Sequence, residues 1–268
     1  MVRVRGGRAD RRADTLVAEE PLEIRLGGRA LAVTMRTPGD DFALAAGFLV
    51  SEGVLARGGE LAGITYCAGA VDGAEGGNSY NVVDVRPAAG VALPDITLER
   101  HVYTTSSCGL CGKASLDAVR TTTRWPLADE GMRLTPEVLA VLPERLRAGQ
   151  RVFDRTGGLH AAALFTPAGE LIDLREDVGR HNAVDKLVGR ALQQDRLPLR
   201  DTVLMVSGRA SFELAQKAAM AGIPALAAVS APSSLAVDLA AETGMTLVGF
   251  LRGDSMNVYA GEHRIALG

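Results

Sequence analysis

Two short runs in the C-terminal half are apolar at every position, and they constrain the fold more than any other feature of the chain. They are Val203-Leu204-Met205-Val206 and Leu226-Ala227-Ala228-Val229. A half-exposed strand alternates apolar and polar residues, whereas a strand that is buried on both faces is apolar throughout. We therefore expect these runs to be parallel neighbours in a sheet that helices cover on both faces.

The residues around these runs alternate between strand and helix patterns, which is typical of a three-layer α/β domain. We assign this domain to residues 135–268, beginning with a helix over 136–148 that Thr135 caps. Strands are expected at 161–165, 171–175, 202–206, 225–229, 246–250 and 256–259, and helices at 181–192, 212–221 and 233–242.

The first half of the chain predicts a smaller α+β domain, which we assign to residues 1–134. Its expected elements are a β-hairpin that turns at Gly27-Gly28, a helix and two further strands, at residues 21–37, 40–51, 64–68 and 81–86. We interpret Cys67 as a small buried hydrophobic residue. The arginine-rich first twelve residues are expected to form a frayed, solvated tail.

Composition disfavours several classes of protein. The formal net charge of -3 and the pI near 5.9 provide no overall attraction to nucleic acid or to an anionic membrane. No apolar run approaches the roughly 20 residues that span a bilayer. With 3 Cys in 268 residues and no signal-peptide pattern, we expect a cytoplasmic protein without structural disulfides.

Two of the three cysteines, Cys108 and Cys111, lie three positions apart within the segment 106–113. We place this pair at a junction between a strand and a helix, where the positive end of the helix and the nearby Lys113 favour the thiolate form of Cys108. The glycines that follow each cysteine would let a large partner approach closely. A thiolate in such a place is a nucleophile.

Four interpretations of this pair compete. A zinc site would need two more ligands, and the chain has no second Cys-x-x-Cys motif, only Cys67 and four scattered histidines, so we expect no metal. A structural disulfide is disfavoured by the low cysteine content, and an inert pair by the flanking glycines. Thiol–disulfide exchange or persulfide transfer is favoured, and the residues alone leave these two open.

Anion-binding groups are expected where glycine turns follow strands of the α/β domain and lead into helices. The turn 207–211 supplies Ser207 and Arg209, and the turn 251–255 supplies Arg252 and a carboxylate suited to guanine or ribose. A third turn, 175–182, has alternating charges that fit either a helix cap with ion pairs or a functional site. His160 and His181 are expected to be buried hydrogen-bonding residues.

Motifs along nearly the whole chain resemble the formate dehydrogenase accessory protein family of sulfurtransferases. They are Glu20-Pro21-Leu22, Thr37-Pro38-Gly39-Asp40, Gly47-Phe48-Leu49, Ser107-Cys108-Gly109-Leu110-Cys111-Gly112, Gly157-Gly158-Leu159-His160, the segment 176–186, Ser207-Gly208-Arg209 and Asn257-Val258-Tyr259. The resemblance implies a core domain similar to cytidine deaminases. The zinc signature of those enzymes is absent, since Ala161-Ala162 follows His160 and Ser107 precedes Cys108.

The resemblance also implies a sulfur relay. A cysteine desulfurase would form a persulfide on Cys108, with Cys111 as its companion, and the sulfur would pass to the molybdenum of a bis(molybdopterin guanine dinucleotide) cofactor that formate dehydrogenase requires. By position, the family's stretch for this guanine-nucleotide-containing cofactor falls on Phe250, Leu251, Arg252, Gly253, Asp254 and Ser255, and we add Ser207 and Arg209 as further candidates. A homodimer is expected. A non-catalytic chaperone for the cofactor or apoenzyme, and a disulfide oxidoreductase, are the alternative functions.

Overall fold

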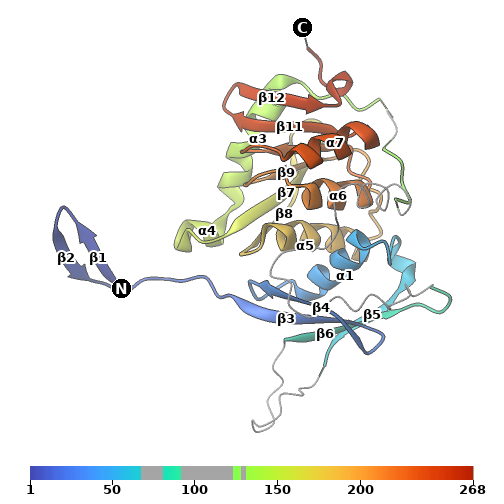
Figure 1. Ribbon diagram of the computed structural model, residues 1–268, viewed down its shortest axis with the longest axis horizontal. Coiled ribbons are helices and arrows are strands. Elements are labelled where there is room, and N and C mark those ends of the chain that lie inside the picture. The colour runs from blue at the N-terminus through green and yellow to red at the C-terminus, as the bar shows by residue number, and fades with distance from the viewer. Residues whose placement is uncertain (68–80, 92–122, 128–130, 268) are drawn as a thin grey trace.

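The computed structural model describes residues 1–67, 81–91, 123–127 and 131–267 (Figure 1). Cys108, Cys111 and the strand and helix expected around them lie outside these residues. The described part of the chain contains three sheets, of six, four and two strands. Helices α1 (Asp41–Ser51) and α5 (Arg180–Gln193) lie between the two larger sheets (Figure 1).

The six-stranded sheet has the strand order β12-β11-β10-β9-β7-β8. The two apolar runs form β9 and β10, which are parallel to each other, and β10 is also parallel to β11, as expected. The remaining pairs are antiparallel, so the sheet is mixed. The strands are β7 (His160–Phe165), β8 (Leu171–Asp177), β9 (Val203–Val206), β10 (Ala225–Ala228), β11 (Thr246–Arg252) and β12 (Ser255–Ala260).

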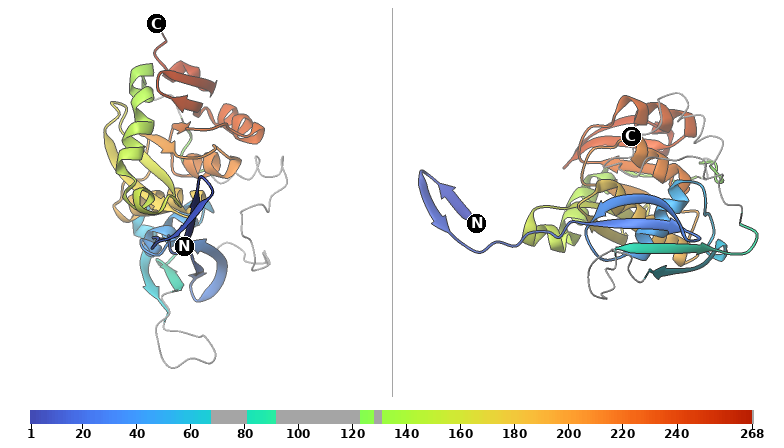
Figure 2. Two further views of the ribbon diagram at one scale, coloured as in Figure 1. Left: turned by 90° about the vertical axis from the view of Figure 1, so that its left-hand side faces the viewer. Right: turned by 60° about the horizontal axis from the view of Figure 1, so that its bottom comes forward.

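Helices cover both faces of this sheet, as the apolar runs predict. Successive residues of a strand point to opposite faces, so Leu204 and Leu226 pack against α5 (Arg180–Gln193), α6 (Phe212–Met220) and α7 (Ser234–Thr243). Met205 and Ala227 pack against α3 (Pro136–Gly149) on the other face (Figure 2). The three-layer α/β architecture is confirmed, and the likeness to cytidine deaminases stays a prediction.

Two local expectations about helices have different outcomes. Thr135 caps α3 as predicted, because its hydroxyl accepts a hydrogen bond from the Val138 N–H at 3.3 Å. The short helix α4 (Arg151–Thr156) was not predicted. At six residues it is too short to show a helical repeat of apolar positions.

The four-stranded sheet has the order β4-β3-β6-β5 and forms the expected N-terminal α+β part. Gly27 and Gly28 have φ values of 57° and 81°. A two-residue type I′ hairpin turn requires a positive φ at both of its central residues. Cys67 is only half-buried, so its assignment to the core was wrong. The elements are β3 (Glu20–Leu26), β4 (Arg29–Arg36), α1 (Asp41–Ser51), a 3₁₀ turn (Gly58–Glu60), β5 (Leu61–Tyr66) and β6 (Val82–Pro87).

Helix α1 packs against α5 at very short range. A Cβ atom on Gly47 would lie 1.9 Å from the Asp185 carbonyl oxygen, and one on Gly189 would lie 1.8 Å from the Ala43 carbonyl oxygen. Only glycine at both positions allows the two backbones to come this close. One continuous hydrophobic core contains Leu22 of β3 together with residues of α1, α5, α6 and α7, and the domain boundary at residue 134 stays a prediction.

The first residues form a third, separate sheet. β1 (Val2–Arg5) and β2 (Arg8–Arg11) pair as an antiparallel hairpin, so the expectation of a frayed tail was wrong. Across the residues that the structure describes, no helix is long and apolar enough to cross a membrane.

Candidate functional site

Four strands of the six-stranded sheet end at one edge. β8 and β9 are both antiparallel to β7 and therefore point the same way, and β10 and β11 are parallel to β9. Helices α5, α6 and α7 begin at this edge, directly after β8, β9 and β10. The first N–H groups of a helix and its dipole attract anions. We name this edge, with the loops 207–211, 230–233 and 250–255, the carboxyl edge.

Backbone hydrogen bonds hold the three loops of the carboxyl edge in a row. The Ser233 N–H donates to the Ala210 carbonyl oxygen at 3.0 Å, and the Phe250 N–H donates to the Ser230 carbonyl oxygen at 3.2 Å. The two anion sites that were predicted from separate parts of the chain therefore share one edge, with β10 between them.

Ser207 and Arg209 occupy the loop between β9 and α6, as predicted. The Ser207 hydroxyl oxygen accepts a hydrogen bond from the Ala161 N–H at 2.9 Å, which joins the end of β9 to β7. The hydroxyl hydrogen can still be donated to a ligand. Arg209 is exposed. Gly208 lies beside the His160 ring, because a Cβ atom there would be 3.6 Å from His160 Nδ1.

The predicted cofactor stretch lies between two strands, as the expected strands at 246–250 and 256–259 imply. β11 extends to Arg252, Gly253 turns with φ 55°, and the chain returns along β12, so the turn forms a β-hairpin. Leu251 is buried, whereas Arg252, Gly253, Asp254 and Ser255 are exposed. The charged side chains of this stretch therefore stand on a hairpin tip beyond the sheet.

Phe250 is strained at the base of this hairpin. Its φ is 51°, in the left-handed region that a non-glycine residue enters only at a cost of about 1–2 kcal/mol. Its side chain is 40% exposed. Strain of this kind in an exposed aromatic residue, at the edge where ligands of α/β sheets collect, indicates a functional position.

A cluster of polar side chains lies where α5 and α6 begin. His181 Nε2 is 3.3 Å from Ser211 Oγ and 3.8 Å from Glu213 Oε2. Burial, helped by the charges of Arg180 and Lys217, lowers the pKa of His181 from 6.5 to about 4. This histidine is therefore neutral at pH 7 and can accept or donate a hydrogen bond.

Arg180 is the cation of this cluster. Burial lowers the pKa of His160, and the positive charge of Arg180 lowers it further. The charge of Arg180 also lowers the pKa of His181. The Arg180 Nε atom is buried and has no hydrogen-bond partner in the part of the chain that the structure describes. A buried guanidinium nitrogen without a partner can receive an anionic ligand. Both histidines are half-buried, and the expected hydrogen bond is present for His181.

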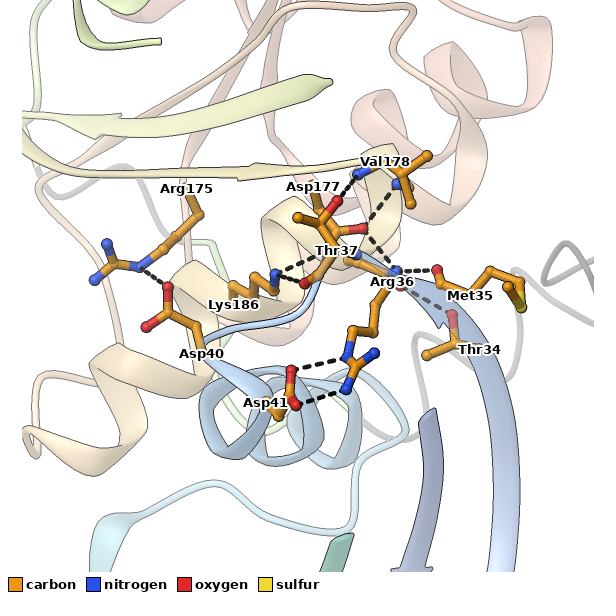
Figure 3. A network of polar contacts seen from close by, with 12 residues as sticks. Thr34, Met35, Arg36, Thr37, Asp40, Asp41, Arg175, Asp177, Val178 and Lys186 are labelled. Carbon is orange, nitrogen blue, oxygen red and sulfur yellow. Dashed lines mark hydrogen bonds and ion pairs between the residues drawn. The ribbon is translucent and has the colours of Figure 1, made fainter. Parts of the chain in front are cut away.

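The turn between β8 and α5 is held by a buried polar network, which Figure 3 shows. Lys186 Nζ lies 2.7 Å from Asp177 Oδ2 and donates to the Thr37 carbonyl oxygen at 2.9 Å. The Thr37 N–H donates to Asp177, and the Val178 N–H donates to the Thr37 hydroxyl at 3.1 Å. This part of the 175–182 turn is structural, and it positions the neighbouring Arg180.

A second buried ion pair joins α5 to α6 and α1. Lys217 Nζ on α6 lies 2.8 Å from both carboxylate oxygens of Asp185 on α5, and the Ser51 hydroxyl of α1 donates to Asp185 Oδ1 at 2.8 Å. Burial raises the pKa of Asp185, against the opposing effect of Lys217. These contacts hold α1, α5 and α6 together beneath the carboxyl edge.

Sequence patterns placed Ser207, Arg209 and the 250–255 stretch at this edge but did not select Arg180 or Ser230 as site residues. Arg180 falls within the charged turn 175–182, and Ser230 directly follows an apolar run, and these positions were the available signals. Among the described residues there is no group of three acidic, histidine or cysteine side chains that could hold a metal ion. The predicted roles of Cys108 and Cys111 stay predictions, because both residues lie outside the described part of the chain.

Comparison with known proteins decides the family. The model of the FdhD/NarQ family matches residues 17–266. The chain belongs to this family. It is similar to the sulfur carrier protein FdhD of Streptomyces avermitilis, with 78% identity over 268 residues, 100% of this chain and 94% of the relative. The sulfur carrier protein FdhD of Mycobacterium tuberculosis is 57% identical over 255 residues, covering 95% of this chain and 92% of that protein.

The fold of an FdhD/NarQ protein also has a counterpart among solved structures. A crystal structure of a candidate formate dehydrogenase accessory protein from Desulfotalea psychrophila superposes with a TM-score of 0.75 at 25% identity. The match covers 99% of this chain and 96% of that one. The family resemblance inferred from the motifs is therefore confirmed.

Proposed function

We propose that this protein is a sulfurtransferase of formate dehydrogenase maturation. It accepts sulfur from a cysteine desulfurase as a persulfide on Cys108 and delivers it to the molybdenum of bis(molybdopterin guanine dinucleotide). The observation that carries the proposal is the full-length similarity to relatives named sulfur carrier proteins, together with the Cys108–Cys111 pair in the same chain.

The first chemical step is a transfer between two sulfur atoms. The Cys108 thiolate attacks the terminal sulfur of the desulfurase persulfide, a new sulfur–sulfur bond forms, and the desulfurase cysteine leaves as a thiolate. No electrons are gained or lost overall in this exchange. Cys111 is close enough in sequence to receive or release the sulfur in a later step.

The carboxyl edge fits the guanine nucleotide part of the proposed cofactor. A chain with net charge -3 can hold several phosphates only through a local positive field. The starts of α5, α6 and α7 and the side chains of Arg180, Arg209 and Arg252 provide one. The exposed ring of Phe250 offers a surface on which a guanine base stacks.

Nucleotide binding is tested with GDP as the probe, by isothermal titration calorimetry on the full chain. Arg252→Ala should weaken GDP binding by about tenfold or more, since a charge-assisted hydrogen bond is worth about 1.5–3 kcal/mol. Arg196→Ala is the matched control, because Arg196 is exposed just after the C-terminal end of α5, at the opposite edge of the sheet. Equal GDP affinity of wild type and Arg252→Ala would contradict this role.

A cofactor-binding chaperone without sulfur chemistry is the second candidate, because the carboxyl edge carries groups that bind anions, namely the exposed Arg209 and Arg252 and the Arg180 Nε atom. The two candidates differ in a sulfur acceptance assay with desulfurase and ³⁵S-labelled cysteine. A sulfurtransferase loses labelling in Cys108→Ala while its GDP binding is kept. A chaperone shows no labelling in wild type either. Reversible oxidation of both cysteines without labelling would instead support a disulfide oxidoreductase.

A further inference from the structure

The N-terminal hairpin stands apart from the body of the molecule. β1 and β2 pair around a turn in which Gly6 and Gly7 have φ values of 57° and 74°. Within the described residues, the hydrogen bonds of residues 1–12 join only members of this segment, and residues 1–16 are all exposed. Figures 1 and 2 show the hairpin at the end of an extended linker. We name residues 1–16, the hairpin with its linker, the arm.

The arm is attached to the body beside the carboxyl edge. Val17 is the first half-buried residue, and a Cβ atom on Gly158 would lie 3.1 Å from Val17 Cγ1. His160 follows two residues after this glycine and begins β7 at the edge where β9 ends, because these two strands are antiparallel. Gly208, in the loop 207–211, lies beside this histidine. The arm therefore leaves the body next to a loop that is assigned to anion binding.

The net charges of the arm and of the body have opposite signs. Residues 1–12 contain five Arg and one Asp, a net charge of +4, which leaves 24 basic and 31 acidic side chains, a net charge of -7, on the rest of the chain. A ligand that carries several phosphates therefore meets a body of its own sign and an arm of the opposite sign. The five arginines of the arm add to the three that the carboxyl edge provides, Arg180, Arg209 and Arg252.

The register of the hairpin gathers three arginines on one face. Residues that are directly opposite in an antiparallel pair share a face of the sheet. Arg3 is opposite Asp10, and Arg5 is opposite Arg8. The one carboxylate on this face, that of Asp10, lies 3.3 Å from Arg12 Nε and is already paired. The guanidinium groups of the other three arginines are exposed, and their planar fork of donors matches the oxygens of a phosphate.

The arm is long enough to cross the carboxyl edge. The loops 207–211, 230–233 and 250–255 follow β9, β10 and β11, which are one, two and three strands away from β7. At about 4.8 Å between neighbouring strands, the farthest loop begins roughly 14 Å from the attachment of the arm. Residues 12–16 alone extend about 16 Å at roughly 3.3 Å per residue. Residues 13–16 form neither helix nor strand, so rotation of a few backbone bonds there redirects the hairpin.

We propose that the arm folds over the carboxyl edge of its own chain and places Arg3, Arg5 and Arg8 on the phosphates of the bound guanine nucleotide. The inference rests on the proposed nucleotide binding at this edge. It adds three ligand-binding residues to that site, in a segment that precedes the part of the chain matched by the family model, which begins at residue 17. Arginine binds phosphate through charge-assisted hydrogen bonds, so the arm acts on the diphosphate and not on the base.

Isothermal titration calorimetry on the full chain tests the proposal, with GDP and guanosine as probes. Arg3→Glu with Arg5→Glu should weaken GDP binding by about tenfold or more at low salt, and by less at high salt, where ions screen exposed charges. Guanosine has no phosphate, so the variant and wild type should bind it equally. Arg29→Glu with Arg196→Glu is the matched control, because it changes the net charge equally at exposed positions outside the carboxyl edge, and it should keep the GDP affinity of wild type.

Limited proteolysis with trypsin reports the position of the arm. Trypsin cleaves after exposed arginines, and Arg11 and Arg12 are both exposed. Saturating GDP should slow the release of N-terminal peptides from wild type severalfold, whereas guanosine should not. This protection should be independent of protein concentration, because the arm closes on its own chain. The melting temperatures of the arm variant and of wild type without ligand should be equal, since the substituted side chains are exposed.

The outcomes separate the arm from the nucleotide site. If Arg252→Ala weakens GDP binding but the arm variant binds GDP as tightly as wild type, the role of the arm is overturned and the nucleotide site remains. Cleavage of the arm at the same rate with and without GDP would also overturn its role. Protection that rises with protein concentration would assign the contact to a second copy of the chain, against the proposal. A wild type that binds no GDP would overturn both the nucleotide site and the role of the arm.

Discussion

The Gly47→Ala substitution tests the contact between α1 and α5 on which the common core depends. The added Cβ atom would lie 1.9 Å from the Asp185 carbonyl oxygen and 2.8 Å from the Gly189 nitrogen. Both neighbours are backbone atoms, so neither can rotate away. Relief of the clash requires the two helices to separate.

The size of this separation sets the expected loss of stability. Carbon and carbonyl oxygen atoms approach to about 3.3 Å, so the helices must part by roughly 1.4 Å. A radial gap of about 0.5–1 Å already removes a quarter to a half of the dispersion energy between facing atoms. Overpacking costs typically about 1–3 kcal/mol, and we expect about 3 kcal/mol here because the whole helix contact is opened.

Urea denaturation followed by circular dichroism measures this loss. At this chain length, about 3 kcal/mol corresponds to a melting temperature that is lower by roughly 6–12 °C. Gly59→Ala is the control, because nothing lies within 4 Å of its added Cβ atom, and its free energy of unfolding should change by less than about 0.5 kcal/mol. Gly189→Ala opens the same contact, so the double variant should cost less than the sum of the two. A Gly47→Ala protein as stable as the control would refute the reasoning.

Three further predictions concern the carboxyl edge and its support. The pKa of His181 is about 4 in the folded protein and 6.5 in the free side chain, so the unfolded state binds more protons than the folded state between these pH values. The free energy of unfolding should therefore fall by up to about 3 kcal/mol as the pH is lowered from 6.5 to 4. Urea denaturation across this range should show a flatter profile for His181→Gln, and parallel profiles would disprove the shift. Lys186→Met leaves Asp177 buried without its ion-pair partner and should lower the free energy of unfolding by about 3–5 kcal/mol. The double variant Lys186→Met with Asp177→Asn should recover part of this loss. A double variant no more stable than Lys186→Met alone would contradict this. Phe250→Asn should leave the free energy of unfolding unchanged, because asparagine tolerates the left-handed backbone conformation of this position. It should weaken GDP binding by about tenfold, because the ring that stacks on guanine is lost. An unchanged GDP affinity would show that Phe250 has no such role.

Local patterns in the sequence predicted most of the elements. The Gly27-Gly28 turn and the two apolar runs depend on neighbouring residues only, and the corresponding hairpin and parallel strands are present. The strands expected at 246–250 and 256–259 are also present on either side of the Gly253 turn, and β12 returns alongside β11.

Contacts between distant parts of the chain could not be predicted from one sequence. Gly47 and Gly189 face each other across 142 positions, and neither has a local pattern that names its partner. The same holds for Thr37 and Asp177, whose hydrogen bond joins the end of the β3–β4 hairpin to the residues just before α5. Ser207, Arg209 and Arg252 were predicted because each lies in a turn that directly follows a strand pattern. Arg180 was missed because the turn 175–182 also contains structural residues such as Asp177, and the sequence does not separate the two kinds.

Intact-mass spectrometry after incubation with a desulfurase and cysteine tests the central claim most directly. A persulfide adds one sulfur, about 32 Da, to the protein, a covalent change that a purely binding role does not produce. We expect this addition on wild type and on Cys67→Ala, and none on Cys108→Ala. An addition that survives in Cys108→Ala, or a wild type that never gains the mass, would contradict the account.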